Sequence, residues 1–311
     1  MSNSGVLVPK RKGLIRFWPL YSMMIPGLLY LIINNYIPMF GLVIAFKRLN
    51  FRLGILKSPW VGFENFKFLF LTPDAFVMTR NTILYNLLFI VIHTMVAILF
   101  ALLLNEIRGR FAKSVYQNLI LLPHLISMVI VSYLVYAFLA MDTGLINNSI
   151  LAPLGREEIM WYQEKRFWPL ILVIVSTWKG FGFQCVIYLS ALVGIPKDYY
   201  EASYIDGAGK FCQLWNITLP LLKPTIIILT LLAVGRMFYS DFGLFYQVPM
   251  RQGALYDVTT TIDTYVYRAL MTLGDISMSS AAGFYQSLVG FVCILGANAL
   301  VRKIEPSSSL F

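Results

Sequence analysis

Three ionisable side chains, Lys179, Arg236 and Asp241, fall inside long apolar stretches of this sequence. A charged group at the middle of a membrane-spanning helix costs about 2.5 to 3.5 kcal/mol on insertion scales, so it usually faces protein or water. Arg236 and Asp241 stand five residues apart and do not share a helical stripe. Two roles remain open for all three: pairing within the membrane, with each other or with a partner subunit, or contact with a solute.

The remaining reactive side chains form no catalytic constellation. His93 and His124 are far apart in sequence and lack a nearby acidic partner, which favours structural roles. The run 207–210 (G-A-G-K) is too short for a phosphate-binding loop, and neither H-E-x-x-H nor G-x-S-x-G occurs. The three cysteines lack metal-site spacing: Cys185, Cys212 and Cys293. We therefore expect no catalytic residue, metal or cofactor in this chain.

Composition places these residues in a membrane protein. Hydrophobic residues make up 58% of the 311-residue chain and charged residues only 13%, against roughly a quarter charged in soluble domains. The net charge of +10 is scattered, with no basic tract longer than residues 10–12, so it fits contact with lipid headgroups and not with nucleic acid.

Apolar stretches predict an all-α, polytopic membrane protein with six spanning helices, at residues 20–46, 81–104, 117–140, 168–193, 219–248 and 281–301. We expect one transmembrane domain over 20–301, between tails 1–19 and 302–311. Pro26, Asn34, Asn35 and Pro38 predict a kink or a shallower dip in the first helix. Lys and Arg are divided almost equally between the two sides, so charge leaves the orientation open. The aromatic segment within 47–80 predicts either an amphipathic piece at the interface or a simple aromatic belt.

The loop 194–218 has a polarity unlike that of the other loops. Pro196 suits the first turn of a helix, and residues 197–205 can form two turns. Asp206 can cap a second short helix, and Gly207 allows a sharp corner between the two. The sequence therefore predicts a helical hairpin, either an ordinary structured loop or an element that docks on another protein.

This hairpin resembles the "EAA" loop of binding-protein-dependent import permeases, with the pattern E-A-A, three residues, G, and later I-x-L-P. The matching residues are Glu201, Ala202, Gly207, Ile217, Leu219 and Pro220. Ser203 stands where the family usually has a second alanine, a small-for-small exchange. Further segments resemble the sugar-uptake branch: residues 60–66, 122–123, 178–180 and 259–268. Residues 241–249 resemble permeases for complex oligosaccharides or polysaccharide fragments.

The resemblance implies the type I ATP-binding-cassette importer permease fold and alternating access driven by a separate ATPase. ATP and Mg²⁺ would be bound by a cytoplasmic ATPase dimer, and this chain would hold no cofactor. The other implied partners are a second related permease, with a heterodimer expected, and an extracytoplasmic solute-binding protein. The implied location is the bacterial inner membrane, with the loop and both termini cytoplasmic. The implied coupling residues are Glu201, Ala202, Ser203, Asp206, Gly207, Ala208 and Gly209.

If the cargo is a sugar, aromatic faces and hydrogen-bonding groups inside the spans become candidates for its path, although lipid contact and packing are common roles for such aromatics. The candidates are Trp178, Lys179, Gln184, Arg236, Tyr239, Asp241, Tyr133, Tyr136 and Tyr285. An acidic glycan would give Lys179 and Arg236 a direct role, since cations in a low dielectric attract carboxylates strongly.

The alternative in another class is a secondary transporter driven by an ion gradient. That class typically has carboxylates buried at the midplane of the membrane and paired broken helices. Asp241 alone gives little support for this alternative. Vanadate sensitivity of uptake would separate the two.

Overall fold

The computed structural model describes residues 17–304 as helices joined by turns. Five helical segments are long and apolar enough to cross a membrane: Trp18–Phe46, Asp74–Glu106, Lys165–Val193, Lys210–Val234 and Ile276–Lys303. A sixth crossing results if Arg110–Leu125 and Met128–Leu139, which meet at 94°, form one broken span. The predicted all-α membrane fold is confirmed. Residues 1–16 and 305–311 of the predicted tails lie outside the described part.

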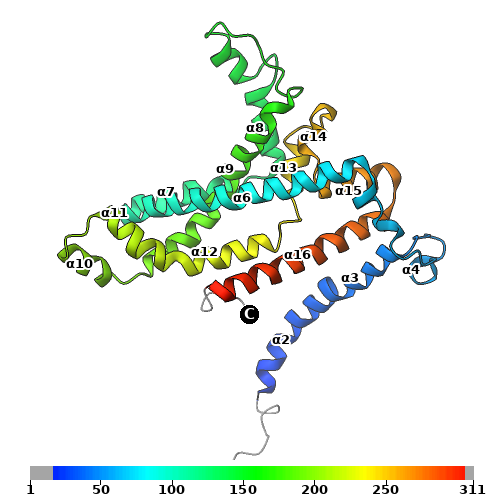
Figure 1. The fold of residues 1–311 in the computed structure, drawn as a ribbon, viewed down its shortest axis with the longest axis horizontal. Helices are drawn as coiled ribbons and strands as arrows, with labels where there is room; N and C mark the ends of the chain where they lie inside the picture. Colours follow the sequence, from blue (N-terminus) through cyan, green and yellow to red (C-terminus); the bar gives the residue numbers. More distant parts are fainter. Residues whose placement is uncertain (1–16, 305–311) are drawn as a thin grey trace, which may run out of the picture.

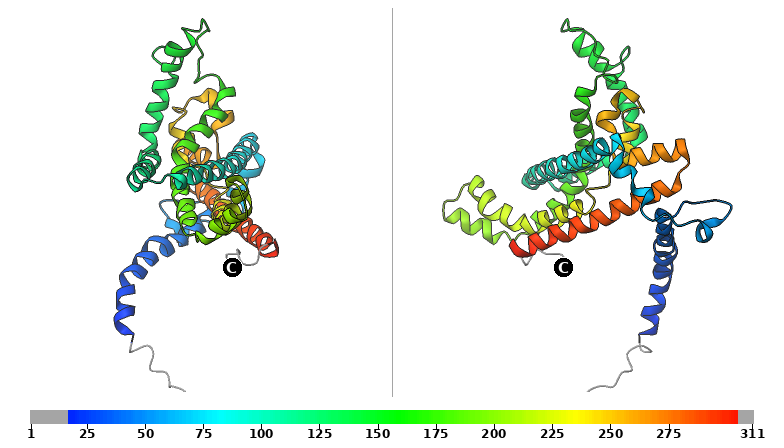
Figure 2. Two further views of the ribbon diagram at one scale, coloured as in Figure 1. Left: turned by 90° about the vertical axis from the view of Figure 1, so that its left-hand side faces the viewer. Right: turned by 45° about the vertical axis from the view of Figure 1, so that its right-hand side comes forward.

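The first span is irregular where Pro and Asn interrupt its sequence. α2 (Trp18–Leu31) continues through a π-helical turn η1 (Ile32–Tyr36), α3 (Ile37–Met39) and a 3-10 segment η2 (Phe40–Phe46). No residue of α2 is buried, and α2 leads away from the other helices in Figures 1 and 2. An apolar helix without cover from its own chain requires lipid or another subunit against it.

Short helices follow the first span: α4 (Gly54–Lys57), η3 (Glu64–Phe66) and α5 (Phe68–Leu71). The ring of Phe46 stacks on Trp60, with centroids 5.8 Å apart, and meets Phe284 of α16 (Ile276–Ile304) at 5.2 Å. Phe66 is buried whereas Trp60 and Phe63 are exposed. This one-sided burial is that of an amphipathic segment.

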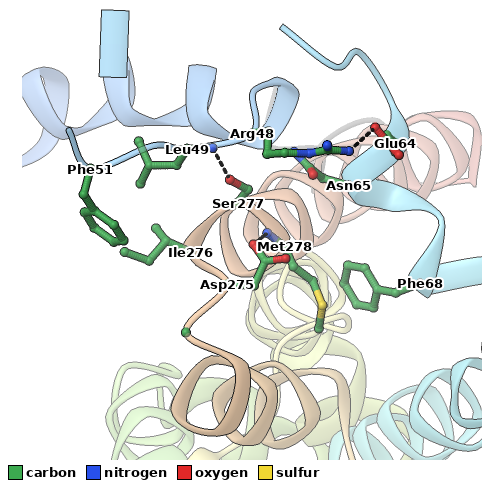
Figure 3. Close-up of a pocket in the computed structure, with 11 residues that line it drawn as sticks. Arg48, Leu49, Phe51, Glu64, Asn65, Phe68, Asp275, Ile276, Ser277 and Met278 are labelled. Carbon is green, nitrogen blue, oxygen red and sulfur yellow. Dashed lines mark hydrogen bonds and ion pairs between the residues drawn. The ribbon is translucent and has the colours of Figure 1, made fainter. Parts of the chain in front are cut away.

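A cleft of about 480 Å³ separates this segment from the turn between α15 (Ile262–Leu273) and α16. Figure 3 shows two bonds at this cleft: Arg48 pairs with Glu64 at 3.0 Å on one wall, and the Leu49 amide donates across to Ser277 Oγ at 3.0 Å. The segment is thereby attached to the beginning of the last span.

Two predicted helices are broken, and both predictions of continuity were wrong. The stretch 117–140 consists of α7 (Arg110–Leu125) and α8 (Met128–Leu139), because Ile126 and Ser127 are extended and the Ser127 hydroxyl caps α8. The stretch 219–248 ends as α12 (Leu219–Val234), and a turn over 235–241 leads to a separate helix α13 (Phe242–Gln247). Apolar stretches lie on both sides of each break, which is why the sequence pattern joined them into continuous helices.

The other spans agree with prediction in position, and two of them, α6 and α16, are longer than predicted. α6 (Pro73–Glu106) begins before the predicted residue 81, because Thr72 is extended and Pro73 opens the helix. α9 (Trp168–Val193) has the predicted bounds and packs along α6 as the largest helix contact of the bundle. α16 also begins before the predicted residue 281, directly after α15, which is closed by Gly274 at φ +66°.

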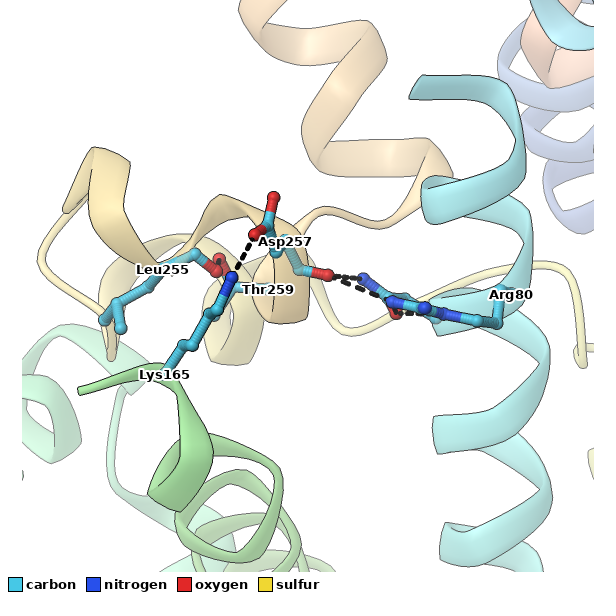
Figure 4. A network of polar contacts seen from close by, with 6 residues as sticks. Arg80, Lys165, Leu255, Asp257 and Thr259 are labelled. Carbon is cyan, nitrogen blue, oxygen red and sulfur yellow. Dashed lines mark hydrogen bonds and ion pairs between the residues drawn. The ribbon is translucent and has the colours of Figure 1, made fainter. Parts of the chain in front are cut away.

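One end of the bundle carries short elements: η4 (Ile146–Leu151), η5 (Lys165–Phe167), η7 (Gly253–Leu255) and α14 (Tyr256–Thr259). Figure 4 shows how Asp257 of α14 joins two of the spans. Its carboxylate pairs with Lys165 at 2.6 Å, and its carbonyl accepts from Arg80 of α6 at 3.2 Å. The ion pair lowers the pKa of Asp257 below its ordinary value, first through the hydrogen bond from Lys165.

Candidate functional site

An open cavity of about 460 Å³ lies where the two helix breaks meet the middle of α6 and α9. Non-helical backbone at membrane depth is tolerated where protein buries it or where it lines a water-filled cavity. Transporters commonly build their solute sites at such interrupted helices. Five predicted pathway residues line this cavity together: Lys179, Gln184, Arg236, Tyr239 and Asp241.

Lys179 of α9 supports the break between α7 and α8. Its ammonium group donates to the carbonyls of Pro123, at 3.3 Å, of His124, at 3.0 Å, and of Ile126. Pro123 and His124 lie in the last turn of α7 and Ile126 directly follows it, a position where carbonyls lack most of the following backbone donors. A cation is also favoured at a helix C-terminus by the helix dipole. Lys179 therefore caps a helix end inside the bundle.

The second break, residues 235–241, is held by side-chain amides of two spans. Asn86 Nδ2 donates to the carbonyls of Met237, at 3.0 Å, and Tyr239, at 2.9 Å. Gln286 Nε2 donates to the Phe238 carbonyl at 2.7 Å. The turn is thus a fixed part of the cavity wall, because its freed carbonyls are satisfied by α6 and α16.

Asp241 closes this turn as the N-cap of α13, where its carboxylate accepts from the Leu244 amide at 3.1 Å. Asp241 forms no ion pair with Arg236, so of the alternatives left open by the sequence, pairing of these two residues with each other is not seen in residues 17–304. Arg236 directly follows Gly235, the residue that ends α12, and its side chain is exposed.

The α6 and α9 wall supplies neutral polar groups. His93 Nε2 lies 3.3 Å from Ser176 Oγ, and its ring stacks on Phe89. Gly180 makes this possible, since a Cβ there would lie 3.0 Å from the His93 ring. Gln184 Oε1 is buried and accepts no hydrogen bond from any residue in 17–304.

Sequence reasoning missed several cavity residues: Asn86, His93, His124, Ser176 and Ser240. The sequence favours structural roles for both histidines, and this stays a prediction. No local motif marks these positions. Their one shared signal is a polar side chain inside or beside an apolar span.

Four predicted pathway residues lie outside this cavity. Trp178 lines a separate, apolar pocket between α8 and α9. Tyr133 is exposed on α8, and Tyr136 packs on Tyr162 with ring centroids 5.7 Å apart. Tyr285 packs on Phe70 and Phe238 in the cluster around η2 and α16. The fold does not bring them to the helix breaks.

The predicted hairpin is present as α10 (Asp198–Ile205), α11 (Lys210–Gln213) and the π-helical turn η6 (Leu214–Thr218). Gly207 forms its corner at φ +82°, as its residue type predicted. Asp206 does not cap the second helix: its backbone completes the last turn of α10, and Gly209 takes the N-cap position without a side chain. The expected cap at Asp206 was therefore wrong.

Side-chain hydrogen bonds join the two arms of the hairpin. Gln213 Nε2 donates to Ser203 Oγ at 2.9 Å, and Ser203 in turn donates to the Tyr200 carbonyl at 2.9 Å. The Tyr200 hydroxyl meets Thr218 Oγ1 at 3.0 Å at the foot of α12. The serine in the second alanine position thus adds a bond that alanine could not make.

The tip of the hairpin is exposed. Tyr204 and Ile205 are 78% and 84% exposed, and Glu201, Ala202, Asp206, Gly207 and Gly209 are exposed as well, while Ser203 and Ala208 are half-buried. The hairpin projects from one end of the molecule, and α4 lies at the other (Figure 1). Lys210 pairs with Glu106 at the end of α6, which connects the hairpin to the bundle.

A helical membrane bundle with broken spans around a polar cavity and an exposed hairpin describes a permease. The binding-protein-dependent transport system inner membrane components match residues 93–306, and the chain belongs to that family. It is therefore a multi-pass inner-membrane transport subunit of an ATP-binding-cassette importer, and the gradient-driven alternative is set aside.

Relatives and solved structures resemble the chain over nearly its whole length. Protein LplB of Bacillus subtilis is 38% identical over 92% of this chain and 89% of its own. The polygalacturonan/rhamnogalacturonan transport system permease protein YteP of the same organism is 38% identical over 91% and 88%. A chain of a bacterial ABC transporter involved in the import of the acidic polysaccharide alginate superimposes with a TM-score of 0.84, at 32% identity over 94% and 98%. A second structure of a bacterial alginate ABC transporter, in complex with an alginate pentasaccharide-bound periplasmic protein, gives the same TM-score at 31% identity over 94% and 97%.

Proposed function

We propose that this chain forms one half of the path through which an importer moves an oligosaccharide or a polysaccharide fragment. The observation that carries the proposal is the polar cavity at the two helix breaks, which offers amide, hydroxyl, imidazole and aromatic groups at membrane depth. Such a mixture suits the hydroxyl groups and apolar faces of a sugar. The names of YteP and of the alginate transporter support the same class of cargo.

The α10–α11 hairpin is the proposed site of energy coupling. Its exposed residues would enter a groove on a cytoplasmic ATPase dimer, which would bind ATP and Mg²⁺. This chain would have no ATPase site of its own. The hydrogen bonds of Gln213, Ser203 and Tyr200 join the two arms of the hairpin, so the hairpin would move as one unit when the ATPase dimer closes. Through the Lys210–Glu106 pair and α12, this movement of the hairpin would reach the helices that line the cavity.

A second, related permease would complete the path, and a heterodimer is the expected arrangement. The uncovered face of α2 supports a further subunit or lipid against the first span. An extracytoplasmic solute-binding protein would deliver the sugar to the end of the bundle opposite the hairpin. With the hairpin in the cytoplasm, six spans, an even number, would put both termini on the cytoplasmic side as well.

Transport would follow from a shift between two packings of the bundle. A shift from 1:99 to 99:1 needs about 5.5 kcal/mol of differential binding, which ATP bound by the closed ATPase pair would supply. The polar cavity would then face alternately the binding protein and the cytoplasm.

The test is uptake of labelled oligosaccharides by the complete importer in proteoliposomes. We expect uptake to require ATP inside the vesicles and to stop with vanadate. Uptake that continues without ATP and follows an imposed proton or sodium gradient would refute the proposal. Uptake of amino acids or metal ions with no oligosaccharide transport would refute the sugar assignment alone.

A further inference from the structure

Arg236 is the one cation of the cavity that has no protein partner in residues 17–304. The other cation, Lys179, is bonded to three carbonyls at the C-terminal end of α7. Arg236 forms neither an ion pair nor a side-chain hydrogen bond within that range, although it lines the same cavity. Its guanidinium therefore offers five donors to whatever enters the cavity.

The position of Arg236 explains how a free cation can remain there. The residue follows the last turn of α12, and the negative end of the helix dipole favours a positive charge at this point. The dipole stabilises the charge without occupying its donors. A cation at membrane depth otherwise needs an anion or water, because its desolvation is costly.

The opposite charge within the cavity is already engaged. The carboxylate of Asp241 accepts the Leu244 amide at the beginning of α13 and does not pair with Arg236. Apart from its two histidines, the charged side chains that line the cavity are two cations and one anion. A ligand with a negative group would balance the remaining charge.

Neutral groups around the guanidinium suit the remainder of a sugar ring. Gln184 Oε1 is buried without a donor and could accept a hydroxyl proton. The Tyr239 side chain also lines the cavity, and its hydroxyl is held by Ser287 Oγ at 2.6 Å. A guanidinium binds a carboxylate through two parallel hydrogen bonds, which also fixes the orientation of the ligand.

We infer that the cavity recognises a sugar carboxylate through Arg236, and that the cargo is an acidic oligosaccharide containing uronic acid. This inference rests on the proposed function and adds the chemical class of its substrate. It assigns Lys179 to the structure of the cavity and Arg236 to the ligand.

The experiment compares two probes of equal length: tri-galacturonate and the same trisaccharide with its carboxyls reduced to alcohols. Binding of each to the purified complex of both permeases with the ATPase pair, without the solute-binding protein and without nucleotide, is measured by thermophoresis at low salt. We expect tri-galacturonate to bind at least tenfold more tightly than the reduced probe. R236Q should abolish that preference, and R236K should keep part of it, because lysine retains the charge without the two-pronged geometry.

Arg156→Gln is the matched control, since Arg156 is exposed outside the cavity and should leave the preference unchanged. Equal affinity for the two probes, no binding of either, or a preference that survives in R236Q would overturn the inference. Loss of the second permease from R236Q preparations without loss of the preference would also overturn it, by showing that Arg236 pairs with that subunit. If neutral oligosaccharides are still imported with ATP in these cases, the proposed function remains; if no oligosaccharide is imported, both fail.

Discussion

The ammonium group of Lys179 lies 3.0 Å from the carbonyl oxygen of His124, a residue 55 positions earlier in the chain. This contact ends α7 inside the bundle and allows α8 to leave at 94°. The two cations of the cavity therefore differ: Lys179 is bonded to backbone carbonyls, whereas Arg236 has no side-chain partner in residues 17–304.

Lys179→Met should destabilise the bundle and impair transport. The carbonyls of Pro123, His124 and Ile126 would lose the lysine donor, and a polar group left unsatisfied in a buried site costs about 1 to 3 kcal/mol. Thermal unfolding of the purified complex and uptake would both be measured. Lys57→Met is the control, since Lys57 is exposed on α4 and far from the break. Unchanged unfolding in Lys179→Met would contradict the capping role.

Asn86→Leu should disturb the turn 235–241. Its amide donates to the Met237 and Tyr239 carbonyls, so its loss leaves two groups at membrane depth without a donor. We expect a loss of about 1 to 3 kcal/mol in stability and lower uptake at unchanged expression. The matched variant is Asn148→Leu, whose amide bonds only the Asp142 carbonyl on an exposed turn. Equal effects of the two substitutions would argue against a special role of Asn86.

Gly207→Val should uncouple ATP hydrolysis from uptake while the bundle stays folded. Valine at φ +82° is strained by about 1 to 2 kcal/mol or more, so the corner of the hairpin would move. Co-purification of the ATPase and sugar-stimulated ATP hydrolysis are the measurements. Gly155→Val places the same kind of strain, at φ +65°, in a turn away from the hairpin and should retain coupling. Full coupling in Gly207→Val would disprove the docking role.

Because of the Lys165–Asp257 ion pair, we expect the folded protein to lose a small amount of stability in acid. The pair lowers the folded-state pKa of Asp257 below its ordinary value of 3.8, so its stabilising effect is complete above that value and is lost as the pH falls through the lowered pKa. Both side chains are more than half exposed, so we expect less than about 1 kcal/mol. Melting of the wild type and Asp257→Asn should differ at pH 7 and converge as the pH falls through the lowered pKa of Asp257. A difference that persists in acid would mean that Asp257 acts through its backbone contacts.

Local patterns were sufficient for the class of protein and for the hairpin. Long apolar stretches predicted spanning helices, and α9 has its predicted bounds because a helix satisfies its own backbone wherever it lies in the membrane. Gly207 predicted a corner because only local backbone sterics decide that conformation. Asp206 does not cap the second helix because that helix begins later in the chain, with Gly209 at its N-cap position.

The sequence by itself determined that this chain is a helical membrane protein with a hairpin suited to a partner. Only the tertiary structure decided where the spans break and which polar residues meet there. Apolar stretches flank both breaks, and each break depends on donors from distant helices: Lys179 for the first, and Asn86 and Gln286 for the second. Such donors can be assigned to a break only after packing brings them within hydrogen-bonding distance.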